Sequence, residues 1–396
     1  MTQESAQLLG QRNVADEALV EEMGEPEATS AEGEEFFIAS QWQLMWWRFR
    51  RHKLALISMI VTIAIYIVAI FAGFFAPFDP RAYSAKYAYA PPQPIRFYDR
   101  TADGGIKLGL YIYDYKVEQD PETYKRTFVY DTDRKIPVRF FAEGTPYTIL
   151  GLIPARVRLL APVEENAPMF LLGADRLGRD MLSRIIFGAQ ISLSIGLVGV
   201  FLSFFLGIII GGFAGYLGGL LDEVVQRLTE FLRSIPSIPL WLGLSAAVPP
   251  GWDPLMVYFA ITVILSLRGW TGMARVVRGR FLSLREEDFI LAAQLDGASN
   301  WRIVVRYMVP SFLSYIIARI TMAVPGMILG ETSLSFLGLG LRPPLISWGV
   351  LLKEAQLVRV LVSSPWLLYP GLAVVLTVLA MNFMGDGLRD AADPYA

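Results

Sequence analysis

The sequence contains no cysteine and only one histidine, His52. This absence excludes disulfide bridges and cysteine-ligated zinc, and it leaves histidine chemistry to a single residue. His52 belongs to the basic cluster Arg48–Lys53 directly before a long apolar run, a position typical of a membrane interface. The phosphate-binding pattern G-x-x-x-x-G-K-[ST] is also missing, and we interpret Gly211-Gly212 as a site of close helix packing or a tight turn. We therefore predict no catalytic residues, no metal ligands and no cofactor in this chain.

Charged residues are few and unevenly distributed. They make up 18% of the chain against 54% hydrophobic residues, which indicates a polytopic membrane protein. Six segments come near the roughly 20 apolar residues that a hydrocarbon layer requires. They are Leu54–Phe75, Ala189–Leu217, Phe231–Val248, Leu255–Met273, Phe312–Leu337 and Leu367–Met384. The third is the weakest, because Pro236 and Pro239 interrupt it, and interrupted spans are tolerated mainly inside helix bundles.

The distribution of basic residues predicts the orientation of these spans. The cluster before the first span places the N-terminus in the cytoplasm. Six crossings return the C-terminal residues 391–396 to the same side. The segment 274–310 also falls there, and its arginines agree with that side: Arg275, Arg278, Arg280, Arg285, Arg302 and Arg306.

Two segments differ from the apolar core in composition. Residues 1–40 hold ten acidic residues against Arg12 alone, which is the composition of a solvated, disordered tail. The tail lacks the basic start of a signal peptide, so we expect the first span to be retained. Residues 77–168 form the largest soluble segment, on the outer side, and Ile106–Val117, Arg126–Asp131 and Ile136–Phe141 read as strands separated by turns at Asp-Pro-Glu-Thr and Asp-Thr-Asp-Arg. We predict a β-rich insert; a loosely ordered loop is the alternative.

The polar stretch LAAQLDGASNWRIVVRYMVP, residues 291–310, lies between two apolar spans. It resembles the coupling loop of ABC importer permeases, E-A-A-x-x-x-G ending in L-P, except that Leu291 replaces the Glu and Val309 the Leu. Two alanines and a glycine let a short helix approach a partner surface, and a proline closes the hairpin. An ordinary helix with its C-cap is the alternative interpretation. The predicted docking residues are Leu291, Ala292, Ala293, Asp296, Gly297, Ala298 and Pro310.

Further motifs extend this resemblance from about Gln41 to Tyr395, the β-rich insert apart. In order along the chain they are WWRFRRHKLALISMI, FAPFDP, LLGADRLGRDMLSR, AGYLGGLLDEVVQR, GWTGMARVVRG, LGETSLSFLGLGLRPP, SWG and MNFMGDGLRDAADP. Together they resemble the second permease subunit of the dipeptide/oligopeptide/nickel class of bacterial ABC importers. The insert is longer than is usual in that family, which leaves the substrate open.

The resemblance implies an all-α polytopic protein of the bacterial inner membrane, with six transmembrane helices in the type I importer permease fold. It divides the chain into a basic segment and first span (41–76), the insert (77–168) and a five-helix core (169–390) with the hairpin 274–310. Its implied partners are a homologous second permease, two ATPase subunits that hold ATP and magnesium, and an outer solute-binding protein, with no nucleic acid. The implied cargo is a peptide, or alternatively an oligosaccharide or a nickel chelate.

The fifth span carries the residues that we predict to lie along the transport path. Met322, Gly326, Leu329 and Ser333 fall on one helix face, with Glu331 beside them. Ionisable groups at membrane depth usually face a bundle interior or an aqueous cavity. We therefore hypothesise that Glu331 meets water in the outward-open state and is buried in the inward-open state. A structural ion pair, and close helix packing at the glycine, are the alternatives.

Two other classes of protein need features that this sequence lacks. A secondary transporter requires inverted repeats with matched broken helices, and the broken third span has no evident counterpart. A receptor or channel with an outer sensory cap would explain the insert but not the hairpin. The permease is therefore the function that we predict.

Overall fold

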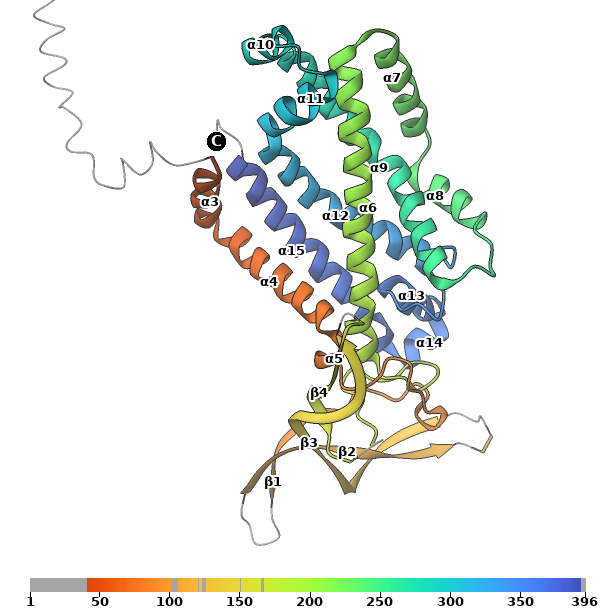
Figure 1. Cartoon of the computed structure of the whole chain (residues 1–396). Coiled ribbons are helices and arrows are strands. Elements are labelled where there is room, and N and C mark those ends of the chain that lie inside the picture. Colours follow the sequence, from red (N-terminus) through yellow and green to blue (C-terminus); the bar gives the residue numbers. More distant parts are fainter. Residues whose placement is uncertain are drawn as a thin grey trace, which may run out of the picture.

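The computed structural model describes residues 41–100, 106–119, 121–122, 126–149, 151–164 and 167–392. The predicted acidic tail, residues 1–40, lies outside the described residues, as do residues 393–396. The described chain is a bundle of long helices with a sheet at one end and a short helical hairpin at the other (Figure 1). We call these the sheet end and the hairpin end.

Within the described residues, five helical segments are long and apolar enough to cross a membrane. They are α4 (Lys53–Ile70), α6 (Met181–Leu217), α9 (Pro254–Leu284), the segment Asn300–Phe336 that ends in α12 (Leu313–Phe336), and Pro365–Ala392, which contains η5 (Pro365–Leu368) and α15 (Tyr369–Ala392). The first predicted span is shorter than expected because the helix is interrupted at Phe71 before the single turn α5 (Ala72–Phe75). The second is longer, because α6 already begins at Met181.

The predicted third span, Phe231–Val248, is wrong as a continuous helix. The chain instead forms α7 (Gly219–Ser234) and α8 (Ser237–Ala246), with Ile235 in an extended conformation between them. A residue before proline is pushed out of the helical region, and Ile235 precedes Pro236. At ten residues, α8 measures about 15 Å, half of a hydrocarbon layer. The two helices together carry the chain from α6 back to α9 (Figure 1).

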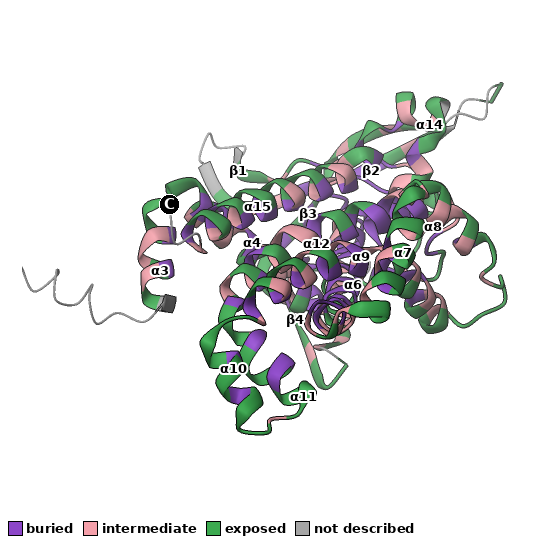
Figure 2. Cartoon of the chain, turned by 90° about the horizontal axis from the view of Figure 1, so that it is seen from above, coloured by how far each residue is buried: buried purple, intermediate pink, exposed green. Residues whose placement is uncertain are grey.

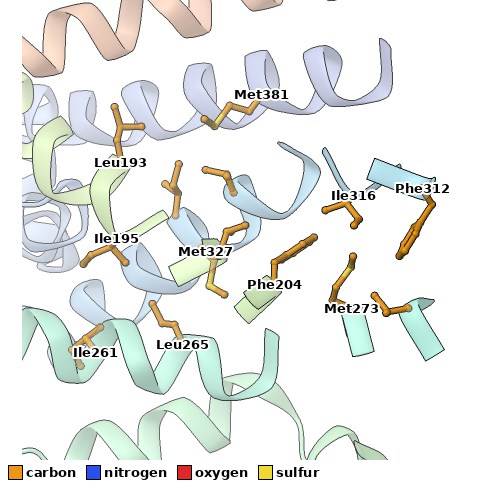
Figure 3. Close-up of a cluster of buried hydrophobic side chains, with 14 of the residues drawn as sticks. Leu193, Ile195, Phe204, Ile261, Leu265, Met273, Phe312, Ile316, Met327 and Met381 are labelled. Carbon is orange, nitrogen blue, oxygen red and sulfur yellow. The ribbon is translucent and has the colours of Figure 1, made fainter. Parts of the chain in front are cut away.

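The helix α6 lies at the centre of the bundle. Figure 2 shows it end-on beside α9 and α12, the two helices on which it mainly packs, with much of its ribbon coloured as buried. Its apolar side chains meet those of the neighbouring helices in one core (Figure 3). The labelled members are Leu193, Ile195, Phe204, Ile261, Leu265, Met273, Phe312, Ile316, Met327 and Met381.

Small residues bring α6 and α9 into close contact. Gly207, Gly211 and Gly215 recur every fourth residue along α6 and pack on the backbone of α9. A side-chain carbon added at Gly211 would lie 2.3 Å from the carbonyl oxygen of Ala274. Such spacing lets helix backbones approach closely in membranes. The interpretation of Gly211 as a packing residue is therefore confirmed.

Two more helices wrap the bundle. The first span α4 packs along α15, and the preceding helix α3 (Gln41–Arg51) folds against the end of α15 through Met45 and Phe49. The side chain of His52 caps α4 by accepting a hydrogen bond from the backbone N–H of Ala55. Short elements fill the sheet end beyond α12: α13 (Trp348–Leu352), η4 (Lys353–Gln356) and α14 (Val358–Ser363).

The segment between the first two spans is β-rich, as predicted. Four antiparallel strands pair in sequence order: β1 (Arg96–Arg100), β2 (Ile106–Gln119), β3 (Arg126–Ile149) and β4 (Ile153–Pro162). The prediction of a turn at Asp-Thr-Asp-Arg is wrong, because β3 continues through it as a bulge where pairing shifts between Tyr113 and Asp114. Ion pairs from Lys116 to Asp131 and from Arg134 to Asp114 hold that bulge.

One arginine fastens the sheet to the helices. Arg158 on β4 is 1% exposed, and its guanidinium donates to the carbonyl oxygen of Ala76 at 2.6 Å and to the hydroxyl of Thr145 at 2.7 Å. Ala76 follows the last turn of α5, so the cation lies at the negative end of a helix. Burial lowers the pKa of the Arg158 guanidinium. The sheet is therefore attached to the end of the first span by a buried polar contact.

Candidate functional site

The predicted docking hairpin forms at the end of the bundle away from the sheet (Figure 1). It consists of α10 (Asp288–Leu295), a turn at Gly297, α11 (Asn300–Arg302) and the π-helical turn η2 (Ile303–Met308). Gly297 has a φ of +75°, and the N–H groups of Gly297 and Ala298 donate to the carbonyls of Gln294 and Ala293, each at 3.0 Å. This pair of hydrogen bonds ends a helix at a residue with a left-handed backbone conformation, which is usually glycine. The glycine C-cap interpretation therefore describes the local backbone correctly.

The outward face of α10 is apolar. Leu295 is 89% exposed and Leu291, one turn earlier, is also exposed, whereas Ile290 and Ala293 are buried against the bundle. Ala292, Asp296, Gly297 and Pro310 are exposed, and Ala298 is half-buried. Exposed apolar side chains that cluster on one face mark a contact surface. Six of the seven predicted docking residues are thus accessible to some degree, and Ala293 alone faces inward.

The hairpin is joined firmly to the long helices. Trp301 stacks on Phe213 of α6 with ring centres 5.8 Å apart, and Gln294 donates a hydrogen bond to the hydroxyl of Tyr216. Val304 packs in the same core as Phe281 of α9. A displacement of α10 would therefore reach α6 and α9 directly.

Pro310 does not end the hairpin as sharply as predicted. The helical segment Asn300–Phe336 runs on through it, with the π turn η2 before it and the 3₁₀ turn η3 (Pro310–Phe312) after it. Proline has no N–H group, so the regular bonding pattern must change around it. In the π turn the N–H of Val309 donates to the carbonyl of Val304, five residues back. Such turns inside long helices occur frequently at functional sites.

The predicted path residues on α12 lie on a face that the rest of this chain leaves largely uncovered. Apart from its chain neighbours and the backbone of its own helix, no atom of the described chain lies within 4 Å of a side-chain carbon added at Gly326, and Leu329 is 45% exposed. Ser333 is half-buried. Met322 lies at the edge of this face, where it packs on Gly385 of α15.

Glu331 points away from that face and is fully buried. Its carboxylate accepts three hydrogen bonds from serine hydroxyls: Ser192 on α6 at 3.1 Å, and Ser335 and Ser347 at 2.7 Å each. Ser335 lies on α12 and Ser347 caps α13. The structure thus places Glu331 apart from the other four predicted path residues. Its partners are hydroxyl groups and not the basic residue of an ion pair.

The same three serines also bind backbone groups. Ser192 accepts from the N–H of Trp348 at 3.1 Å, Ser335 accepts from Leu341 at 3.0 Å, and Ser347 accepts from Val350 at 3.2 Å. The buried carboxylate therefore fixes the loop 337–347 and the start of α13 against α6 and α12. We call Glu331, Ser192, Ser335 and Ser347 the serine clamp.

Sequence reasoning missed this clamp. Ser335 and Ser347 stand in the motifs LGETSLSFLGLGLRPP and SWG, so both belong to a recognisable sequence pattern. Ser192, however, lies 139 residues before Glu331, within an apolar run. Nothing local in the sequence connects it to the carboxylate.

A second polar junction precedes α6. The carboxylate of Asp175 pairs with Arg179 at 2.6 Å and with Arg184 at 3.3 Å. Asp180 caps α6 by accepting from the N–H and the hydroxyl of Ser183. Burial raises the pKa of the Asp180 carboxyl to about 6, although its bonds to Ser183 act in the opposite direction. This junction holds the start of α6 at the sheet end.

Long apolar helices around a central α6, and an exposed hairpin joined to them at one end, define a multi-pass membrane protein of the permease class. Comparison with known families gives the same class. Residues 207–395 match the model of the binding-protein-dependent transport system inner membrane component. Residues 40–92 match the N-terminal transmembrane domain of oligopeptide transport permease C.

Individual relatives agree with these families. The dipeptide transport system permease protein DppC of Bacillus subtilis (strain 168) is 37% identical over 248 residues, 61% of this chain and 75% of its own length. The oligopeptide transport system permease protein OppC of Escherichia coli (strain K12) is 42% identical over 235 residues, 59% of this chain and 74% of its own. The chain belongs to the family of dipeptide and oligopeptide permeases, the membrane subunits of ABC importers. The resemblance seen in the sequence is confirmed.

One further relative aligns over almost the whole chain. The dipeptide transport system permease protein DppC of Lactococcus lactis subsp. cremoris (strain MG1363) is 30% identical over 366 residues, 90% of this chain and 91% of its own length. The unaligned tenth of this chain is shorter than the segment 77–168, so the alignment must extend into that segment.

Proposed function

We propose that this permease subunit carries peptides, pairs with a homologous second permease, receives its cargo from a solute-binding protein and is driven by two ATPase subunits. The matched relatives are named for dipeptides and oligopeptides, which favours peptides over oligosaccharides or nickel chelates. ATP and magnesium would be held by the partner ATPases. This chain would contribute half of the path and no chemistry of its own.

The hairpin end would lie in the cytoplasm of the bacterial inner membrane, together with both termini. Exposed arginines support this side, since cytoplasmic segments of membrane proteins are enriched in basic residues. Arg275, Arg280, Arg302 and Arg306 are exposed on or beside the hairpin, and none of them forms an ion pair within the described part of the chain. The sheet end would then face outward.

The hairpin would couple ATP hydrolysis to transport. The observation that carries this role is the exposed apolar side of α10, with Leu295 at 89% exposure, on an element joined to α6 and α9. An ATPase surface that moved α10 would move those helices with it. Closure of the ATPases would thereby switch the bundle between inward-open and outward-open states as rigid bodies.

The open face of α12 would line the path opposite the second permease. Met322, Gly326, Leu329 and Ser333 supply it, and the lack of contacts at Gly326 leaves room for a partner or cargo. Glu331 would act indirectly, by holding the serine clamp. The sheet would offer its exposed apolar residues, such as Phe97, Leu108 and Phe141, to the binding protein or the partner permease.

Purification of the assembled importer tests the coupling role. Leu295→Asp places a charge at the centre of the proposed contact, so the ATPase subunits should no longer purify with the permease. Leu357→Asp is the matched control, because Leu357 is exposed on the loop before α14 at the sheet end. Retention of the ATPases by Leu295→Asp would contradict docking through this face of α10.

A further inference from the structure

A cavity of about 260 Å³ lies between the loop after α8, the start of α9 and the loop after α12. Prolines form much of its wall: Pro249, Pro250 and Pro254 from one side, Pro343 and Pro344 from the other. Trp252 adds a half-exposed ring. Because proline has no backbone N–H, these walls offer few donors to a ligand. Recognition must therefore come from the small number of polar side chains that line the cavity.

Two such side chains stand out. Arg342 is the only charged residue among the described residues that line the cavity. Ser245 also lines it, is fully buried, and its hydroxyl has no hydrogen-bond partner within the described chain. A buried hydroxyl without a partner is uncommon and costs stability. Its oxygen has almost no accessible surface, so the hydroxyl does not reach into the cavity, and Arg342 is the polar side chain that a ligand there would meet.

Arg342 forms no ion pair with an acidic residue of the described chain. Asp253 follows Trp252, but its carboxylate caps α9 by accepting from the N–H of Leu255 at 2.9 Å. Lys353 reaches toward Gly338 in the same loop as Arg342 and adds positive charge to that side. The cavity therefore suits an anion at one end and apolar atoms along its walls.

The loop that carries Arg342 is held in place before any ligand arrives. Leu341 is buried, and its N–H donates to Ser335 of the serine clamp at 3.0 Å. Gly340 packs on the same serine, where a side-chain carbon would come within 2.5 Å of its backbone nitrogen. Arg342 is thus presented from a preorganised backbone, which favours specific binding.

We propose that this cavity is a subsite for the C-terminal carboxylate of a peptide arriving at the sheet end. The guanidinium of Arg342 pairs with the carboxylate, and the ring of Trp252 covers the last side chain. Arginine matches the planar geometry of a carboxylate with two parallel N–H donors. Every peptide with a free end carries this group whatever its sequence. The inference rests on the proposed peptide cargo, and it adds that the permease itself recognises the C-terminal carboxylate of that peptide.

Uptake by the reconstituted importer, with its binding protein and ATPases, tests the proposal. The probes are trialanine and trialanine amide, and the affinity of the binding protein for each is measured separately. After correction for that affinity, the wild type should import the free acid about tenfold faster than the amide, as expected for hydrogen bonds to a charged group. Arg342→Gln should remove this preference by slowing the free acid alone. Arg342→Lys, which keeps the charge but loses the paired donors, should retain a fraction of it.

The matched control is Arg81→Gln, since Arg81 is an exposed arginine that lines a different cavity near the sheet. It should leave the ratio unchanged. Equal slowing of both peptides by Arg342→Gln would overturn the subsite and assign Arg342 to docking of the binding protein. Equal import of both peptides by the wild type would also overturn it, while peptide import itself would stand. Import of neither peptide would refute the peptide cargo and the subsite with it.

Discussion

Substitution of Gly297 separates two roles of the hairpin turn, its backbone shape and its accessibility to a partner. Its φ of +75° lies in the left-handed region, and an added side-chain carbon meets nothing within 4 Å in the described chain. Gly297→Ala should therefore cost only the backbone strain, about 1–2 kcal/mol. Gly297→Asn should cost less, because asparagine tolerates this region better. Gly297→Trp causes the same backbone strain as Gly297→Ala, and its larger side chain would clash only with a docked partner.

Peptide uptake and ATPase retention are compared for the three variants after thermal unfolding has measured the strain of each. If the hairpin docks, Gly297→Trp should abolish uptake and ATPase retention, whereas Gly297→Ala should lower uptake by about thirtyfold at most, the factor that about 2 kcal/mol produces. Equal loss in Ala and Trp would reduce Gly297 to a structural turn. Wild-type uptake in Gly297→Trp would refute docking at this turn. Ala293→Asp is a poor companion test, because Ala293 is buried and the charge would destabilise the hairpin itself.

Three further predictions follow from buried contacts. Glu331→Cys in this cysteine-free chain should resist a water-soluble thiol reagent in every nucleotide state while Leu329→Cys is labelled; labelling at 331 that rises when ATP hydrolysis is trapped would return Glu331 to the path. Gly211→Val should separate α6 from α9 and cost at least the roughly 1–3 kcal/mol of an overpacked core, lowering the yield of folded permease, whereas Gly326→Val should not; equal yields would contradict the close contact. For Asp180, the folded pKa of about 6 lies above the value of about 3.9 in an unfolded chain. The loss of stability caused by burying its ionised carboxylate is therefore fully present above the folded pKa and fades as the pH falls toward the unfolded pKa. As the pH falls from about 7.5 to about 5, the free energy of unfolding of the wild type, measured by thermal unfolding, should therefore rise by about 1 kcal/mol relative to that of Asp180→Asn. A pH-independent difference between the two would show that Asp180 does not titrate in this range.

The features predicted best from sequence are those that depend on neighbouring residues. Long apolar runs specify spanning helices by themselves, and the Ala-Ala and Gly297 pattern specifies a helix with its turn. The prediction of a continuous third span is wrong for an equally local reason. Pro236 forces Ile235 out of the helical conformation, although the residues around it are apolar. A run of apolar residues shows that a segment prefers the membrane but not that its helix is continuous.

Features that depend on distant pairing could not be predicted. The four residues Asp-Thr-Asp-Arg have the composition of a turn. Ion pairs to the neighbouring strand, from Asp131 to Lys116 and from Arg134 to Asp114, nevertheless hold them inside β3. Glu331 was expected beside the open face of α12 because of its position in sequence. Its burial follows from Ser192 on another helix and from a loop that folds back onto it. Such partners are known only once the bundle is assembled.

The length of α6 has a mechanical consequence. Its 37 residues form an unbroken rod of about 55 Å, well beyond a hydrocarbon layer of about 30 Å. One end touches the hairpin through Tyr216, and the other holds the backbone of Phe78 through Ser183. A tilt imposed at one end therefore appears at the other at once, with no joint to absorb it. The neighbouring segment α7–α8 has such a joint at Ile235, so these two helices can change their mutual angle while α6 moves as one rigid rod.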